Sequence, residues 1–467
     1  MPPQKISLRV YVDPDEIPMI DEAAKREGLS RSTWAKRTLL KQASAVPAQA
    51  PSVSLPITML PPPVAPVLPR EWAQNDGGSI VLLVMDGVGD IPDDRGRTPL
   101  EAARTPNLDR IARKASLGRT IPIAPGVTAG SVAGHLALLG YDPMAVKIGR
   151  GPIDALGVGV DLQPGDVVMR GNFATVKDGI VIDRRAGRLP GDTAAELCFA
   201  LNAKLRFKFE GIETQIAQTA EHRFVLHLRG NNLSPQITDT DPGQNGLPAK
   251  PCRANAPQAA RTAEIVNIVA KAAADFLMIN RANAILLRGA GARPHLASFN
   301  DHYGLNAMAV ATYPTYRGIA AACGMELYPM MPSDAHDAIN FAVSALQGPN
   351  KHQFIFIHYK NTDTAGEDGN FDAKVAAIEH LDAALKPLVD QPPDVLVVAG
   401  DHPTPVAMRG HSWHPVPLMI ASKWTPGGKN QRYTERQCAD GELGTIKATD
   451  VMALAMGHAK RLRKIDT

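Results

Sequence analysis

The sequence has little cysteine, few aromatic residues and little net charge. Its 467 residues include four cysteines, and no two of them form a Cys-x-x-Cys pair. This scarcity argues against a disulfide-stabilised scaffold and a thiolate zinc site, and it favours a reducing compartment. The formal net charge of +3 is too small to indicate a polyanion as the partner of the whole chain.

Long apolar runs are also missing. No run reaches the roughly 18 residues that a membrane-spanning helix needs, and the N-terminus carries charged residues where a signal peptide has an apolar stretch. We therefore expect a cytoplasmic protein with no membrane partner. The chain has the composition of an ordinary globular protein, with 44% hydrophobic and 21% charged residues, and its length allows two or three domains.

The first 43 residues predict a small strand, helix, helix module. Residues 5–12 alternate apolar and polar side chains, which indicates a strand with one apolar face. A helix is expected to open at residues 13–16 and to stop at Gly28, and Ser30 is expected to cap a second helix. About 40 residues of this kind cannot bury a core alone. We therefore expect residues 1–43 to form a homodimer with a second copy.

This module resembles the ribbon-helix-helix dimers, in which a two-stranded ribbon enters the DNA major groove. The resemblance implies that Ser7, Arg9 and Tyr11 face the bases. Eight Lys and Arg against six Asp and Glu in residues 1–43 give a net charge of +2, which is weak electrostatics for DNA. Two interpretations stay open: a DNA-binding module, and a dimerisation arm with no nucleic-acid role.

Residues 44–75 are expected to be a linker. They are rich in Ala and Pro, include the triplet Pro61-Pro62-Pro63 and show no apolar periodicity. Such a composition favours extended, polyproline-like conformations. We place a domain boundary in this segment.

Beyond the linker, three apolar runs predict buried strands, and each leads to polar side chains. The runs are residues 80–85, 354–357 and 395–399, and the side chains are Asp86, Asp363, Asp401 and His402, with His411 farther along. Open α/β sheets bind ligands at the carboxyl ends of their strands. Carboxylate oxygens and imidazole nitrogens there suit divalent metals, although a solvated loop with incidental polar residues stays an alternative for 401–411.

A glycine-rich bend at residues 125–136 leads into an apolar helix and carries Ser131. A serine at such a position is either a helix N-cap or an activated nucleophile, because backbone N–H groups and a nearby cation would both stabilise its alkoxide. The bend by itself does not decide between the two.

Several blocks then occur in an order that is typical of one family. They are GRTPLEAA (96–103), TPNLD (105–109), HLALLGYDP (135–143), GNFATV (171–176), DRRAGR (183–188) and NAILLRG (283–289). Residues 78–457 thus resemble the archaeal type of cofactor-independent phosphoglycerate mutases, within the alkaline phosphatase superfamily. The resemblance implies an α/β fold, with an alkaline-phosphatase-like sheet sandwiched by helices and an inserted smaller α/β domain, next to the N-terminal β-α-α module. The implied domains are a catalytic domain, 76–144 and 305–467, and a substrate-binding insertion, 145–304.

The resemblance also implies a mechanism with two divalent metal ions and a phosphoserine at Ser131. One ion would be held by Asp86, Ser131, Asp401 and His402, and the other by Asp363, Glu367 and His411. The substrate would be a small phosphorylated metabolite, 2- or 3-phosphoglycerate. The residues implied to bind it are His135, Asp183, Arg184, Arg185, Arg188, Arg288, Arg293 and Arg317. Guanidinium groups suit a ligand with both phosphate and carboxylate, but the stretch 183–188 could also be an internal salt-bridge cluster.

Three positions depart from the family pattern. Glu367 stands where the family has His, Val132 where an acidic residue follows the nucleophile, and Arg317 where Lys is usual. Glu is a harder ligand than His, so we expect manganese or magnesium to be favoured over zinc or cobalt. Two alternatives to a mutase therefore stay open: a metal-dependent phosphohydrolase or phosphotransferase on another small phosphoester, and a DNA-binding regulator with a degenerate mutase-like domain.

Overall fold

The structure, a computed structural model, divides into two compact units, residues 1–61 and 62–467. The described residues are 17–27, 62–146, 148–205, 209, 211–277, 281–347, 351–427 and 430–465. Among them, no helix is long and apolar enough to cross a membrane.

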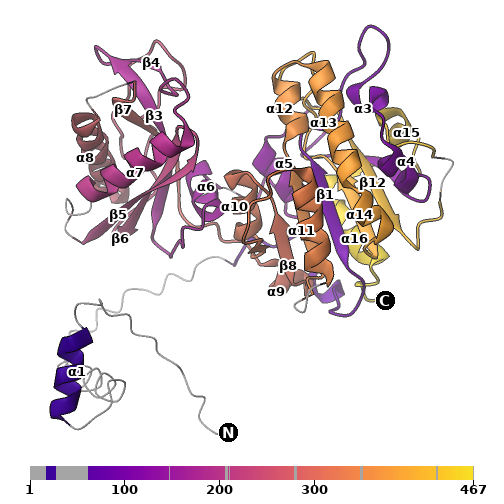
Figure 1. Cartoon of the computed structure of the whole chain (residues 1–467), viewed down its shortest axis with the longest axis horizontal. Coiled ribbons are helices and arrows are strands. Elements are labelled where there is room, and N and C mark those ends of the chain that lie inside the picture. The colour runs from indigo at the N-terminus through magenta and orange to yellow at the C-terminus, as the bar shows by residue number, and fades with distance from the viewer. Residues whose placement is uncertain are drawn as a thin grey trace. The chain divides into compact units, whose positions relative to one another are not determined.

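The first unit contains the helix α1, Ile17–Arg26, which ends before Gly28 as expected (Figure 1). Its last residue, Arg26, pairs with Glu22 one turn earlier at 2.6 Å. The predicted strand at 5–12, with Ser7, Arg9 and Tyr11, and the helix expected from Ser30 lie outside the described residues. Dimerisation and DNA binding by this module stay predictions.

The end of the expected linker differs from a free spacer. Val64 and Val67 donate backbone hydrogen bonds to the carbonyls of His295 and Gly140, at 2.9 and 2.8 Å. A 3-10 turn, η2 (Arg70–Trp72), follows, and Leu68 is buried in the core of the second unit. Residues 62–75 thus belong to the second unit, because their non-proline positions still pair with it and bury apolar surface.

The second unit is built on an eight-stranded sheet in which the central strands are parallel. Its order is β13-β2-β12-β11-β1-β10-β8-β9. The strands are β1 (Ile80–Met85), β2 (Ser116–Ile121), β8 (Ala307–Val310), β9 (Glu326–Leu327), β10 (Phe354–Tyr359), β11 (Val395–Ala399), β12 (Val416–Ser422) and β13 (Gly444–Lys447). The three apolar runs are thus adjacent parallel strands, with β1 between β10 and β11.

Helices cover both faces of this sheet, which explains why β1 is apolar at every position (Figure 1). Ile80, Leu82 and Val84 belong to one core, and the alternating residues of β1 belong to the other. The first core includes α5 (Ser131–Leu138), α10 (Pro314–Ala322) and α16 (Val451–His458). The second includes α4 (Pro106–Ala112), α11 (Ala335–Gln347), α13 (Phe371–Ala384) and α14 (Lys386–Asp390). The predicted sheet sandwiched by helices is confirmed.

Short helices complete this part of the unit. They are α3 (Pro99–Ala102), α9 (Phe299–Tyr303), α12 (Asn361–Glu367), α15 (Glu435–Ala439) and η4 (Ala448–Asp450).

A second, five-stranded antiparallel sheet lies wholly within residues 145–304. Its strands are β3 (Val167–Lys177), β4 (Ile180–Asp183), β5 (Ile212–Ala220), β6 (Arg223–Gly230) and β7 (Ala284–Gly291), in the order β4-β3-β6-β5 with β7 paired to β3. The helices α7 (Gly191–Leu205) and α8 (Ala260–Phe276), with the short η3 (Pro257–Ala259), contribute to its main core. The helix α6 (Arg150–Gly157) packs on the other face of β3.

The helix α6 also packs against α10 at very short range. A Cβ atom added at Gly157 would lie 1.8 Å from the carbonyl oxygen of Pro314, and one at Gly318 would lie 1.7 Å from that of Ile153. Only glycine permits such a contact, so the two backbones touch directly. Asp154 of α6 also accepts a hydrogen bond from Thr315 of α10 at 2.8 Å and pairs with Arg170 of β3 at 2.9 Å.

Candidate active site

The polar residues at the strand ends meet at one edge of the large sheet. In the parallel register Met85 of β1 lies beside Tyr359 of β10, and Val84 lies beside Ala399 of β11. The loops that follow these strands therefore start side by side. This explains how Asp86, Asp363 and Asp401, far apart in the sequence, come together.

A first cluster is formed by Asp86, Asp401, His402 and Ser131. His402 Nε2 lies 3.1 Å from Asp401 Oδ2, 3.5 Å from Asp86 Oδ1 and 3.3 Å from Ser131 Oγ. The two aspartates and the imidazole are fully buried. The structure thus brings together all four residues that were predicted to hold the first metal ion.

Ser131 is the first residue of α5, and the N-cap of that helix is Gly130. The N-cap interpretation of Ser131 is therefore wrong, and its hydroxyl faces His402 instead. The approach depends on Gly134, because a Cβ atom there would lie 2.2 Å from the carbonyl oxygen of Asp401. The side chain of Val132 packs against the apolar core.

A second cluster adjoins the first through His402. It contains Asp363, His402 and His411, and the two imidazole rings stack with centroids 3.5 Å apart. His411 Nε2 lies 3.7 Å from Asp363 Oδ1 and 4.0 Å from Glu367 Oε1. Glu367 is the last residue of α12, and its side chain is 55% exposed. It therefore lies at the open side of the cluster.

These residues fit divalent cations. In each of the two sets, Asp86 with Asp401 and His402, and Asp363 with His402 and His411, one ligand atom per residue lies within 4.8 Å of the others. The buried oxygen Asp86 Oδ1 accepts no hydrogen bond from the described residues, and the buried oxygen Asp401 Oδ2 faces the imidazole nitrogens of His135 and His402. Buried carboxylate oxygens require a compensating cation or donor. Mixed oxygen and nitrogen donors suit manganese, magnesium, zinc and cobalt.

The electrostatics keep both carboxylates of the first cluster charged. Burial opposes the charge of Asp401, but the imidazoles of His402 and His135 outweigh it and hold its pKa well below the usual range. Burial likewise opposes the charge of Asp86, and so does Asp401, yet His358 and Lys360 lower its pKa. Burial would lower the pKa of His402, but Asp401 and Asp86 raise it to about 9. The cluster thus attracts positive charge.

Sequence reasoning missed a lysine at this site. Lys360 Nζ lies 3.1 Å from Asp86 Oδ2, contacts Asp363 Oδ2 and lies 3.0 Å from the hydroxyl of Tyr316. Burial opposes the ammonium charge, but Asp86, Tyr316 and Asp363 raise the pKa of Lys360. The available signal was its place directly after β10, at the same sheet edge as the aspartates.

Two buried histidines contact the aspartates of the first cluster. His358 Nε2 lies 3.1 Å from Asp86 Oδ2, and its ring stacks on Tyr316 with centroids 3.5 Å apart. His135, which we predicted to bind substrate, is fully buried. Its Nδ1 lies 2.7 Å from the carbonyl oxygen of Ser131 and 3.1 Å from Asp401 Oδ2. His135 therefore positions Ser131 and Asp401, and this arrangement does not support the predicted substrate contact.

Lys374, on α13, bonds to the loop after β1 and to the loop after β11, which both carry residues of the first cluster. Its buried ammonium donates to Asp90 and to the carbonyl of Gly87 in the loop after β1, at 2.8 and 3.1 Å. It also donates to the carbonyl of Thr404 in the loop after β11, at 2.8 Å. Asp90 in turn accepts from the backbone N–H of Val406 at 3.1 Å. These bonds hold the two loops to each other.

Among the predicted substrate-binding arginines, two lie beside one shared aspartate and two are exposed. Arg184 forms a two-pronged ion pair with Asp241, at 2.8 and 2.6 Å, and Arg288 lies 3.7 Å from the same carboxylate. The partner of Arg184 is thus Asp241 and not the neighbouring Asp183. Arg185 and Arg188 are exposed.

Further arginines that sequence reasoning did not single out surround Arg288. Burial lowers the pKa of Arg170 to about 10, and Arg223, Arg288 and Arg150 add to this effect against the opposing Asp154. The arginines near Arg288 thus carry more positive charge than the neighbouring aspartate carries negative charge. Such a surplus would suit an anion with more than one acidic group.

Arg317 does not make the contact that was predicted for it. Arg317 is buried and donates to the backbone carbonyls of Gly157, Ala311 and Tyr328. Its predicted phosphate contact is not supported, because these carbonyls already occupy the guanidinium.

Two residues of the insertion also make local bonds. Arg293 donates to the carbonyl of Leu162 at 2.9 Å. Asp183 accepts the backbone N–H groups of Arg185 and Gly187, at 2.8 and 2.6 Å, and so shapes the turn that presents the arginines.

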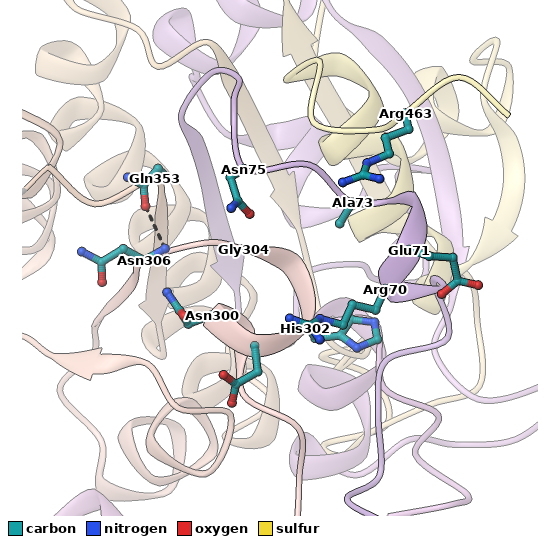
Figure 2. A pocket seen from close by; sticks show the side chains of 11 residues that line it. Arg70, Glu71, Ala73, Asn75, Asn300, His302, Gly304, Asn306, Gln353 and Arg463 are labelled. Carbon is teal, nitrogen blue, oxygen red and sulfur yellow. Dashed lines mark hydrogen bonds between the residues drawn. The ribbon is translucent and has the colours of Figure 1, made fainter. Parts of the chain in front are cut away.

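Figure 2 shows a polar cavity of about 770 Å³ at the opposite edge of the large sheet. Asn75, Asn306 and Gln353, which line it, precede β1, β8 and β10. These are the amino ends of parallel strands, away from the loops that carry the charged clusters. The two ligand sets therefore mark the candidate active site, and this cavity is separate from it.

Comparisons with known proteins identify the family of this chain. A family model described as 2,3-bisphosphoglycerate-independent phosphoglycerate mutase matches residues 112–283. A probable enzyme of that name from Thermosipho melanesiensis is 45% identical over 85% of this chain and 97% of its own length. One from Thermus thermophilus is 41% identical over 85% of this chain and 98% of its own length.

Two solved structures share the fold. A protein from Pyrococcus horikoshii is 28% identical with a TM-score of 0.71 and covers 84% of this chain and 100% of its own. The cofactor-independent phosphoglycerate mutase from Thermoplasma acidophilum is 31% identical with a TM-score of 0.62 and covers 82% of this chain and 100% of its own. With such identity over nearly the full length of its relatives, this chain belongs to the 2,3-bisphosphoglycerate-independent phosphoglycerate mutase family.

Proposed function

We propose that this protein interconverts 2- and 3-phosphoglycerate through a phosphoserine at Ser131, with two divalent metal ions. The observation that carries the proposal is the placement of the Ser131 hydroxyl 3.3 Å from His402, the residue common to both ligand sets. Family membership supports the reaction, because relatives 41–45% identical carry that name.

Each group of residues at the site would have its own role. Asp86, Asp401 and His402 would hold one ion beside Ser131, and Asp363, His411 and Glu367 would hold the other. Two divalent ions can activate a nucleophile and stabilise the charge of a transferring phosphoryl group. Ser131 attacks the phosphoryl group in line and releases glycerate, which reorients and takes the group back on its other hydroxyl. His135 and Lys374 keep the nucleophile and the loops in place.

The arginines of the insertion would hold the glycerate end of the substrate. Arg150, Arg170, Arg223 and Arg288 bring more positive charge than Asp154 and Asp241 neutralise. A carboxylate is the group that planar guanidinium forks bind best besides phosphate. Residues 145–304 would thus form the substrate-binding domain, and closure over the cleft would keep water from the phosphoserine.

The other predictions stay proposals. Residues 1–43 would form a dimerisation module, since α1 has the place and length expected there. A cytoplasmic location is supported by the four cysteines, which are free and buried.

The decisive experiment follows both isomers by ³¹P NMR. The full chain with Mn²⁺ and without 2,3-bisphosphoglycerate is expected to convert 3-phosphoglycerate to the equilibrium mixture with 2-phosphoglycerate. A sample treated with chelator is the control and should be inactive. Release of inorganic phosphate without isomerisation would contradict the proposal and select a phosphohydrolase.

Glu367 should set the metal preference. We expect Glu367→His to shift the best-supporting ion from Mn²⁺ or Mg²⁺ towards Zn²⁺ or Co²⁺, because imidazole is a softer, neutral ligand. The measurement is the ratio of turnover with Zn²⁺ to that with Mn²⁺, with a rise of about tenfold expected from one ligand exchange. Glu264→His, at an exposed position on α8, is the control. An unchanged ratio in Glu367→His would show that Glu367 does not bind the ion.

A further inference from the structure

One ammonium group lies between the two ligand sets. Lys360 Nζ is 3.1 Å from Asp86 Oδ2, which belongs to the first set, and it contacts Asp363 Oδ2, which belongs to the second. Both carboxylates are fully buried, whereas the lysine side chain is 19% exposed. Lys360 thus pairs with one carboxylate from each proposed metal site.

This position creates a competition. A buried carboxylate without a positive partner is strongly unfavourable, so the protein without metal needs a cation close to Asp86 and Asp363. Lys360 contacts the Oδ2 atom of each carboxylate, whereas His402 and His411 face the Oδ1 atoms. A divalent ion bound by the same carboxylates would therefore lie close to the ammonium. Like charges at such distances repel, so the ammonium would weaken the binding of the ions.

We propose that Lys360 is a positioning residue that serves as the internal counter-cation of the metal-free site and limits the affinity for metal. The inference rests on the proposed function in so far as it takes the two ligand sets to be metal sites. The hydroxyl of Tyr316, 3.0 Å from Lys360 Nζ, offers an acceptor that is not a metal ligand. Tyr316 is itself held by stacking on His358, so this acceptor stays in place when the lysine leaves the carboxylates.

The test measures Mn²⁺ binding by isothermal titration calorimetry, and thermal unfolding with and without Mn²⁺, on the full chain after chelation. Lys360→Met should bind Mn²⁺ about tenfold more tightly than wild type, the size of effect that one adjacent charge has on a binding equilibrium. Its unfolding midpoint without metal should fall by several degrees, and saturating Mn²⁺ should restore most of the loss.

Two variants serve as references. Lys360→Arg keeps the charge and should keep the wild-type affinity within a few-fold. Lys386→Met removes an exposed lysine that pairs with Asp390, and it should change neither readout. Lys360→Gln keeps a polar group without charge and gives the same readouts if the methionine variant does not fold.

A lysine with a merely structural role would give a different pattern. Lys360→Met would then lose equal stability with and without Mn²⁺, and its Mn²⁺ affinity would be unchanged or weaker; this result would overturn the inference. The mutase assay on the same samples separates the two proposals. If Lys360→Met binds Mn²⁺ more tightly but the wild type shows no mutase turnover, the proposed function alone is contradicted. If the wild type shows turnover but Lys360→Met has an unchanged Mn²⁺ affinity, the inference alone is contradicted.

Discussion

Ser131→Ala is expected to lower mutase turnover by about 10⁴-fold or more. The substitution removes the only atom of this side chain that can accept the phosphoryl group, so the covalent route is lost and not merely slowed. The fold should be unaffected, because Ser131 does not cap α5. The measurement is the rate of 3-phosphoglycerate conversion at saturating Mn²⁺.

The matched control for this result is Ser344→Ala. Ser344 lies on α11 and bonds only to the carbonyl of Asn340 one turn earlier, at the surface. It should keep wild-type turnover. Incubation of the wild type with substrate should also yield a phosphorylated chain by mass spectrometry, and Ser131→Ala should not. Substantial activity in Ser131→Ala would exclude the phosphoserine route.

Asp401→Asn should have the second-largest effect, a loss of turnover on the order of 10³-fold, since it removes charge stabilisation of several kcal/mol. Asp401 Oδ2 lies 3.1 Å from both His135 and His402, and Oδ1 accepts the N–H of Gly87 at 3.2 Å. An amide would bring a donor to one of these positions and remove one negative charge from the first ligand set. Mn²⁺ affinity measured by calorimetry should fall with turnover.

Asp394→Asn provides the comparison at the other end of the same strand. Asp394 precedes β11 and bonds to the backbone N–H and hydroxyl of Ser79. This variant should keep its Mn²⁺ affinity. If Asp401→Asn kept wild-type affinity, the first ligand set would not be a metal site.

The site was predicted best where a proposed metal ligand lies close to the end of a predicted strand in the sequence. Asp86 directly follows one apolar run, and Asp401 follows another after a single glycine, so the sheet edge on which they lie could be inferred from the strands alone. Arg317 shows where this reasoning ends. The side chain has the expected charge, but a buried position on α10 directs it to backbone carbonyls.

Contacts between distant elements were out of reach of the sequence. The place of Lys360 directly after β10 indicates its sheet edge but not its contact with Asp86, and no local pattern indicates that Arg170 of β3 pairs with Asp154 of α6. The end of the predicted linker, residues 62–75, belongs to the second unit for a related reason. Its composition is that of a spacer, yet Val64 and Val67 find acceptors that lie about 230 and 70 residues away along the chain.

The glycines between α6 and α10 have a mechanical consequence. Because these two backbones touch at Gly157 and Gly318, and Asp154 ties α6 to both α10 and β3, α6 acts as a stiff coupling between the two sheets. A hinge cannot lie within this contact without breaking it. A swing of the small sheet towards Ser131 would therefore have to separate α6 from α10 or from β3, and a bulky residue at either glycine would force the first of these separations.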